Sequence, residues 1–186
     1  MGLFGKSGRR RRAFRSRGAE PLEFTLVLLP LLAMVTVLVD TSWAIFTKAT
    51  LQRAVRIGVR SGITLIKSQL ATGACLTDTV KSTVQSNAIN MLAGSSKLAL
   101  IKVNYFQPPP VNSNAAATDV SADPDGDQPG NIMQVSVQNY SLVPLLPRIF
   151  SWTQAADKNP LVFSVYSSDL IEPSSITDRP CIGTAP

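Results

Sequence analysis

The chain has 186 residues, a formal net charge of +6 and no histidine. A histidine-based catalytic triad or general base is therefore excluded, and no phosphate-cradling or nucleotide-binding motif occurs, so we expect no enzyme and no cofactor. The excess charge lies at one end. Residues 1–18 hold seven basic side chains and no acid, and the remaining residues carry 11 basic and 12 acidic side chains.

The basic leader is followed at once by an apolar segment, in which Asp40 is the only charged residue from Phe24 to Thr47. A transmembrane helix needs about 20 mostly apolar residues, so this segment is long enough to cross a bilayer once. A basic tail can bind nucleic acid, but beside an apolar segment it is typical of a membrane-topology signal. We therefore expect a single-pass protein of the inner (cytoplasmic) membrane, with a cytoplasmic N-terminus, an extracytoplasmic body and no nucleic-acid partner.

The helix is predicted to continue beyond the membrane to about Gln69 and to be broken near Gly73. At about 100° per residue, its outer half has an apolar seam and a basic stripe on opposite faces. The seam consists of Leu51, Val55, Gly58, Gly62 and Leu65, and the stripe of Arg53, Arg56, Arg60 and Lys67. Glycines four residues apart allow another backbone to approach closely. We expect this seam to pack on the chain's own sheet rather than on a neighbouring subunit.

A second helix is predicted from about Asp78 to Leu92, with Thr77 or Asp78 as its cap and Gly94 after its end. Its apolar stripe consists of Leu76, Val80, Val84, Ala88 and Met91.

Three later segments are predicted to be strands, because they are rich in β-branched and aromatic residues or alternate between apolar and polar positions. They are Leu98–Phe106, Ile132–Tyr140 and Leu161–Ile171. The second is predicted to be half-buried, with Met133, Val135 and Val137 on one side and Gln134, Ser136 and Gln138 on the other, solvent side. Residues 107–131 lack apolar periodicity and are predicted to form a flexible surface loop. Residues 142–150 contain two prolines and are predicted to be an apolar connection. This order predicts an α+β fold, in which a small antiparallel sheet packs on the extended helix.

Cys75 and Cys181 are the only cysteines, and both lie beyond the predicted span. In an extracytoplasmic body they would be able to pair. The bridge would close a loop of about 100 residues and contribute about 4–5 kcal/mol on the chain-entropy model. We expect this disulfide; the alternative is two free buried thiols.

Alternating acids in the predicted loop, Asp123, Asp125 and Asp127, are similar to the start of a calcium-binding loop. An EF-hand loop requires glycine at its sixth position and glutamate at its twelfth, where this chain has Gln128 and Gln134. The three acids are therefore only a weak calcium candidate. A solvated acidic loop without a metal is the favoured interpretation.

The junction between the leader and the span resembles the processing site of type IV pilin-like precursors. Glu23 lies five residues after Gly18, and it is followed by Phe24 and the rest of the apolar run. Ala19 comes directly after the glycine. The resemblance implies that a prepilin peptidase cuts after Gly18 and that the mature chain begins with Ala19. Pro21 departs from the small or aliphatic residue expected at the third mature position, which leaves the efficiency of cleavage open.

The family that the chain resembles is the TadE-like minor pseudopilins of tight-adherence (Flp-type) pilus systems. Most of the resemblance lies within residues 15–62, in the segments RSRG, EFTLVLLP and LQRAVRIGVRSG; a later segment, YSLVPL, is also similar. The resemblance implies a pilin-like fold, retention in the membrane after cleavage and a role in pilus assembly and cell adhesion. Implied partners are the prepilin peptidase, other pilin-like subunits, the assembly machinery and the lipid bilayer. The chain then divides into a cleaved leader (1–18), a transmembrane helix (19–47) and an extracytoplasmic domain (48–186).

Glu23 would lie at the edge of the hydrocarbon, where a charge is costly unless it is paired. The new α-amino group of a neighbouring subunit's Ala19 would be a suitable partner, which would couple processing to assembly. The alternative is a carboxylate that reaches the lipid headgroups. Pro30 removes one helical hydrogen bond in the middle of the span and is expected to kink the helix. The kink has either a role in assembly or a purely structural role.

Two other functions fit the N-terminal sequence. Arg11-Arg12-Ala13-Phe14 resembles a twin-arginine signature, and Ser42-Trp43-Ala44 would serve as a cleavage site, which would give a secreted protein that begins at Ile45. Alternatively, an uncleaved signal anchor holds a surface-binding domain. The N-terminus of the mature protein separates these interpretations: Ala19, Ile45 or an intact leader.

Overall fold

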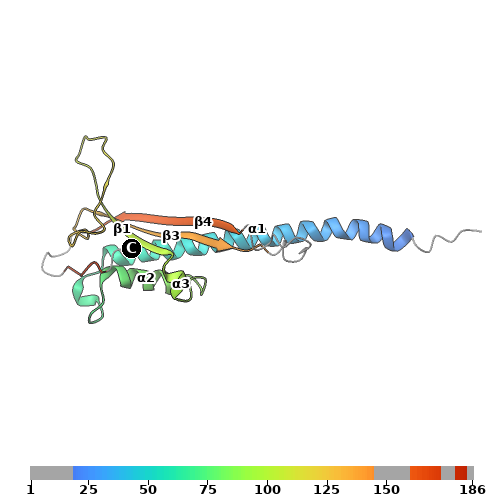
Figure 1. The fold of residues 1–186 in the computed structure, drawn as a ribbon, viewed down its shortest axis with the longest axis horizontal. Helices are drawn as coiled ribbons and strands as arrows, with labels where there is room; N and C mark the ends of the chain where they lie inside the picture. Colours follow the sequence, from blue (N-terminus) through green and yellow to red (C-terminus); the bar gives the residue numbers. More distant parts are fainter. Residues whose placement is uncertain (1–18, 145–159, 173–178, 184–186) are drawn as a thin grey trace, which may run out of the picture.

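The computed structural model describes residues 19–144, 160–172 and 179–183. A long helix packs against a small four-stranded antiparallel sheet (Figure 1), which confirms the predicted α+β class. The helices are α1 (Ala19–Ile63), α2 (Leu76–Asn87) and α3 (Ser95–Leu98), with a 3₁₀ turn, η1 (Lys67–Gln69), between the first two. The strands are β1 (Ile101–Gln107), β2 (Thr118–Asp119), β3 (Ile132–Leu142) and β4 (Leu161–Leu170).

Helix α1 ends at Ile63, before the predicted end near Gln69. The Leu65 amide donates to the Gly62 carbonyl at 3.3 Å, a three-residue bond that tightens the last turn of a helix. Ile66 is extended, with φ −110° and ψ 156°. The chain reverses here so that α2 can pack back on α1, and this tertiary requirement is invisible in the periodicity of the sequence.

Helix α2 begins earlier than predicted, at Leu76, and its N-cap is Cys75 rather than Thr77 or Asp78. The first amides of a helix have no partner within the helix. Here the Leu76 and Thr77 amides donate to the carbonyls of Cys181 and Ile182, at 2.7 and 2.9 Å. The C-terminal segment therefore caps the helix, which moves its start toward Cys75.

The predicted stripe of α2 is buried at Leu76, Val80, Val84 and Ala88. The helix ends at Asn87 rather than Leu92, because Ile89 and Asn90 adopt left-handed backbone conformations with φ of 46° and 61°.

The strand order in the sheet is β2-β1-β3-β4, and all neighbours are antiparallel. Strand β1 begins at Ile101 rather than Leu98, because α3 includes Leu98. Strand β3 continues to Leu142 past an irregularity between Val137 and Tyr140, and such bulges bend and twist a strand locally. The short β2 lies within the segment predicted to be loop, where it pairs with the end of β1.

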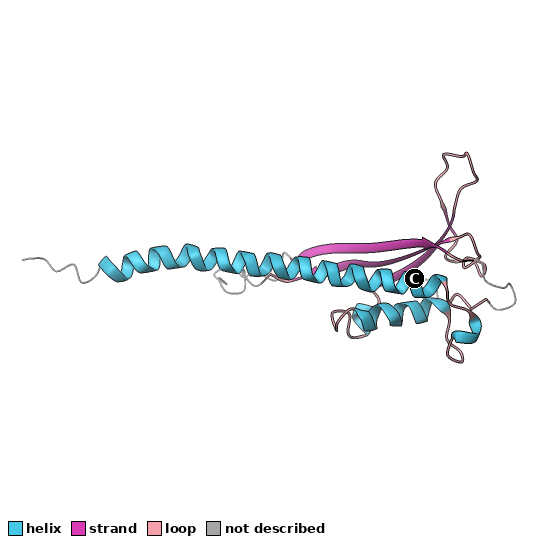
Figure 2. Ribbon diagram, turned by 180° about the vertical axis from the view of Figure 1, so that it is seen from behind, coloured by secondary structure: helices cyan, strands magenta, loops and turns pink. Residues whose placement is uncertain are grey.

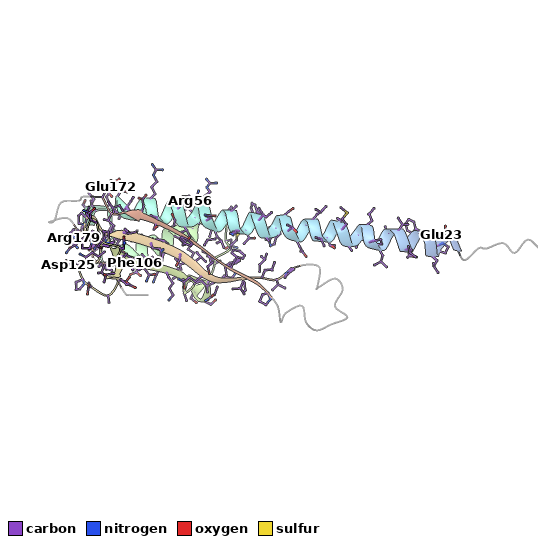
Figure 3. All side chains as sticks on the ribbon, turned by 90° about the horizontal axis from the view of Figure 1, so that it is seen from above. Glu23, Arg56, Phe106, Asp125, Glu172 and Arg179 are labelled. Atoms are coloured by element: carbon purple, nitrogen blue, oxygen red, sulfur yellow. A yellow bond between two sulfur atoms is a disulfide. The ribbon has the colours of Figure 1, made fainter. Side chains whose placement is uncertain are left out.

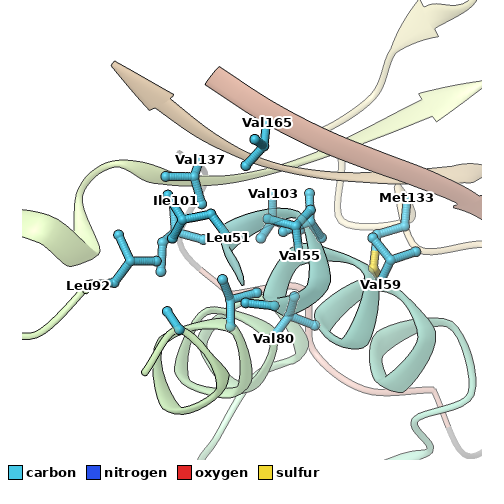
Figure 4. Packing of buried hydrophobic residues seen from close by; sticks show 14 of the residues in the cluster. Leu51, Val55, Val59, Val80, Leu92, Ile101, Val103, Met133, Val137 and Val165 are labelled. Atoms are coloured by element: carbon cyan, nitrogen blue, oxygen red, sulfur yellow. The ribbon is translucent and has the colours of Figure 1, made fainter. Parts of the chain in front are cut away.

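The core lies between the inner face of the sheet and the outer half of α1, with α2 alongside (Figure 4). As the alternation predicted, Met133, Val135 and Val137 of β3 are buried. Ser136, expected on the solvent side, is also buried, because its neighbours across the sheet are Lys102 and Tyr166.

The glycines of the α1 seam mark the closest approach of α1 and α2. A Cβ atom added at Gly58 would lie 2.4 Å from Val84 Cγ2. One added at Gly62 would lie 2.7 Å from Val80 Cγ2 and 2.8 Å from the Met133 sulfur. The seam thus packs within the chain, as expected. Its two glycines approach α2, and Gly62 also approaches Met133 of the sheet.

We predict that Gly58→Leu lowers the free energy of unfolding by about 1–3 kcal/mol, because overpacking forces Val84 and the backbone to shift. Urea unfolding of the detergent-solubilised full-length protein, followed by circular dichroism, measures this change. Ala49→Leu adds a similar bulk at an exposed position of α1 and serves as the control. Equal midpoints for Gly58→Leu and Ala49→Leu would contradict the close packing.

Candidate functional site

The N-terminal half of α1 extends alone beyond the body (Figures 1 and 2). Its apolar side chains face outward: Leu22, Leu26 and Met34 are 65%, 68% and 67% exposed. Continuous apolar surface of this size is not stable in water and marks contact with a membrane or with other proteins.

This half of α1 is able to cross a bilayer. It contains an 18-residue window with a mean hydropathy of 2.4, none of which is buried in the protein. Its apolar exterior and its length meet the requirements of a single span. The chain therefore has one N-terminal helix that is able to serve as a membrane anchor.

Burial within the body begins at Thr47, which is fully buried, and continues at Thr50 and Leu51. Just before it, the rings of Trp43 and Phe46 stack with centroids 5.8 Å apart. Aromatic side chains of this kind are enriched at membrane–water interfaces. The change from lipid-like to protein-like surroundings thus falls near residues 43–47.

Glu23 and Phe24 lie near the free end of this helix, and both side chains are exposed. Helix α1 begins at Ala19, so Glu23 is one turn from its start, far from the body (Figure 3). Gly18 and the rest of the leader lie outside the described residues. Only the downstream half of the predicted processing site can therefore be placed.

The helix is continuous across Pro30. Proline has no amide hydrogen, so the carbonyl four residues earlier, at Leu26, lacks its helical donor. The hydrogen-bond ladder of α1 therefore lacks one bond at Pro30.

A second group of contacts, a disulfide and an ion pair, lies at the opposite end of the body. Cys75 and Cys181 form the expected disulfide, with Cα atoms 4.8 Å apart. Together with the carbonyls that cap α2, this bridge fastens the C-terminal segment to the start of that helix.

Arg179 binds two acids of the acidic loop. Its guanidinium donates to Asp127 at 2.5 Å and to Asp125 at 3.3 Å. The hydrogen bond to Asp127 raises the pKa of Arg179. The Asp127 side chain is almost completely buried, so it is neither solvated, as one interpretation of the sequence proposed, nor directed at an external cation.

Asp123, the third acid of the weak calcium candidate, is exposed. Among the residues that the structure describes, no group of three or more His, Cys, Asp or Glu side chains converges on a common point. Arg179 pairs with the other two acids, Asp125 and Asp127.

Tyr105 joins β1 to the start of α2 beneath this ion pair. Its hydroxyl lies 3.3 Å from the Thr77 hydroxyl. The pKa of Tyr105 is raised to about 12, chiefly by burial of the phenol. The hydrogen bond with Thr77 opposes this shift, and the charge of Asp127 adds to it. The phenol therefore remains neutral at physiological pH and serves as a hydrogen-bonding contact in the core.

Comparison with known families matches residues 19–60 to the model of a family described as TadE-like protein. The chain is TadE-like over this helix. The match covers nearly all of the described helix α1. It indicates a protein associated with tight-adherence pili. Neither the curated proteins nor the solved structures contain a match to the chain.

The two ends of the molecule differ in how much of their structure could be predicted from the sequence. The apolar helix, Glu23, Phe24 and Pro30 could be placed from the sequence. The bond from Arg179 to Asp127 was missed, because 52 residues separate the partners. The only available signal was that Arg179 lies just before Cys181, whose disulfide fixes that segment beside α2.

We predict that replacing both cysteines by serine lowers the free energy of unfolding by about 2–5 kcal/mol, because the C-terminal cap of α2 loses its covalent anchor. Unfolding of wild-type and variant protein with and without reductant measures this. Reductant should move the wild-type midpoint to that of the variant and leave the variant unchanged. Full alkylation of both cysteines in unreduced wild-type protein would contradict the bridge.

Proposed function

We propose that the protein is a minor pseudopilin that a prepilin peptidase processes after Gly18 and that takes part in assembly of a tight-adherence pilus. The observation that most supports this is where the family match begins. The TadE-like match begins at Ala19, directly after the glycine at which a peptidase would cut.

The proposed orientation places the leader in the cytoplasm and the body outside it. Seven basic residues in the leader favour retention on the cytoplasmic side. A disulfide in the body is consistent with an oxidising compartment beyond the membrane. In this arrangement residues 19–47 are the span and residues 48–186 the extracytoplasmic domain.

The proposed role is structural rather than enzymatic. Assembly would proceed through the lipid-facing half of α1, which could exchange contact with acyl chains for contact with the helices of other pilin-like subunits. Between two such helices, Glu23 would be desolvated and would require a cationic partner. The α-amino group that cleavage creates at Ala19 of a neighbouring subunit is a partner of the right charge, at nearly the same depth in the membrane.

The first test concerns cleavage. Intact-mass analysis of membrane-extracted protein should show loss of residues 1–18 in cells that contain a prepilin peptidase. Gly18→Leu should retain the leader, because a bulky side chain is placed at the scissile bond. Gly8→Leu, at another leader glycine, is the matched control and should be cleaved. A mature chain that starts at Ile45, or a wild-type chain that keeps its leader, would overturn the proposed processing.

The second test concerns Glu23. We predict that Glu23→Ala leaves the body folded and the leader removed but abolishes surface pili, because loss of one member of a desolvated ion pair costs about 3–5 kcal/mol. Piliation is scored by electron microscopy, and crosslinking to other pilin-like subunits is scored on the same cells. Glu20→Ala removes a neighbouring acid and should assemble normally. If Glu23→Ala cells form pili and crosslinks like the wild type, Glu23 has no pairing role.

A further inference from the structure

The outer half of α1 has three faces, and the described body covers two of them. One face packs on α2 through Gly58, and another packs on the inner side of β3 and β4. The third face is open. It is a single helical stripe, which we call the cationic stripe, and it consists of Ala49, Gln52, Arg53, Arg56, Ile57 and Arg60.

The three arginines of the cationic stripe are exposed and have no partner among the described residues. None of their guanidinium groups forms an ion pair or hydrogen bond with another described residue. Helix α1 carries no acid between Asp40 and its end. Like charges three and four residues apart destabilise a helix, and nothing within the described body compensates for this repulsion.

The stripe is also shaped to receive another segment. Its residues line a shallow hollow of about 370 Å³, with Ala49 and half-buried Ile57 between the arginines. Arg56 points away from the sheet and the core (Figure 3). Apolar contacts flanked by cations suit a ligand that presents small apolar side chains together with carboxylates.

The spacing of the stripe identifies the kind of ligand. Its positions recur every three or four residues, which is the surface that a second helix covers when it packs at a small crossing angle. A helix that leaves the same membrane beside α1 would arrive in this orientation. Its carboxylates would need the same three- and four-residue spacing to meet the three arginines.

Two of the three arginines lie too far from the proposed span to bind mainly lipid headgroups. At 1.5 Å per residue, Arg56 and Arg60 are about 14 and 20 Å beyond Thr47. The headgroup region on each side of the hydrocarbon is only about 5–8 Å thick. A protein partner is therefore favoured over the membrane surface.

We propose that the cationic stripe docks an acidic, extracytoplasmic helix of another subunit anchored in the same membrane. The proposal rests on the proposed function in one respect, namely that the partner stands beside this chain in the membrane. It adds to that function a contact surface outside the lipid. It also specifies that the partner's surface is acidic and helical.

The test uses the full-length protein in its native pilus-producing cells. The photo-crosslinking residue p-benzoylphenylalanine replaces Gln52, in the middle of the stripe. This replacement is made in four versions of the protein: the wild type, R53E/R56E/R60E (the glutamate variant), R53K/R56K/R60K (the lysine variant) and K67E/K81E/K102E. The last variant makes the same change in net charge outside the cationic stripe and is the matched control. Lys67, which the sequence placed on the same face as the arginines, lies in η1 after α1 has ended.

The proposal predicts a crosslink to a membrane-anchored protein, at a segment with three carboxylates on one helical face. The glutamate variant should lower the yield about tenfold, as expected for three exposed ion pairs. The lysine variant and the control should retain it. Replacing the partner's three carboxylates by lysine should restore the yield with the glutamate variant.

An adduct only with lipid, an adduct only with a second copy of this chain, or an unchanged yield in the glutamate variant would overturn the proposal. Removal of residues 1–18 is followed in the same cells. If the leader is removed normally but no charge-dependent crosslink forms, the docking role of the stripe is rejected and the proposed processing stands. If a charge-dependent crosslink forms on a chain that keeps its leader, the proposed processing is rejected and the docking role stands.

Discussion

The structure depends on one helix that has to satisfy two different surroundings without interruption. The first half of α1 presents apolar side chains in all directions, as a helix in hydrocarbon does, and its second half presents them only toward the body. The sheet and α2 both bury their apolar faces on that second half. The body cannot form its core without α1, so the anchor is a structural part of the domain rather than a tether.

A continuous helix also fixes how the body is presented. A flexible linker between Thr47 and Leu51 would allow the sheet to rotate relative to the anchor. Here both residues are buried within a single helix, so a change in the tilt of the anchor moves the body with it. For a subunit of the proposed kind, this rigidity would let contacts made within the membrane determine the position of the surface outside it.

The far end of the body is held by contacts between distant parts of the chain. The disulfide joins residues 106 positions apart, and the carbonyls beside Cys181 cap α2. Arg179 neutralises the buried Asp127 on the other side of the same segment. A buried carboxylate without such a partner would be strongly unfavourable, so the acidic loop and the C-terminal segment stabilise each other.

The sequence by itself determined the α+β class, the long apolar helix, the inward residues of β3 and the stripe of α2, because each is a local pattern with the period of its element. It also located Glu23, Pro30 and the cysteines. Only the tertiary structure decided where α1 ends, where α2 begins and ends, that Gly58 faces α2, and that Asp127 binds Arg179. These features depend on which distant segments meet: the tail supplies the cap of α2, and the reversal after Ile63 brings that helix onto the glycine seam. The local periodicity of the sequence carries no information about contacts between distant segments.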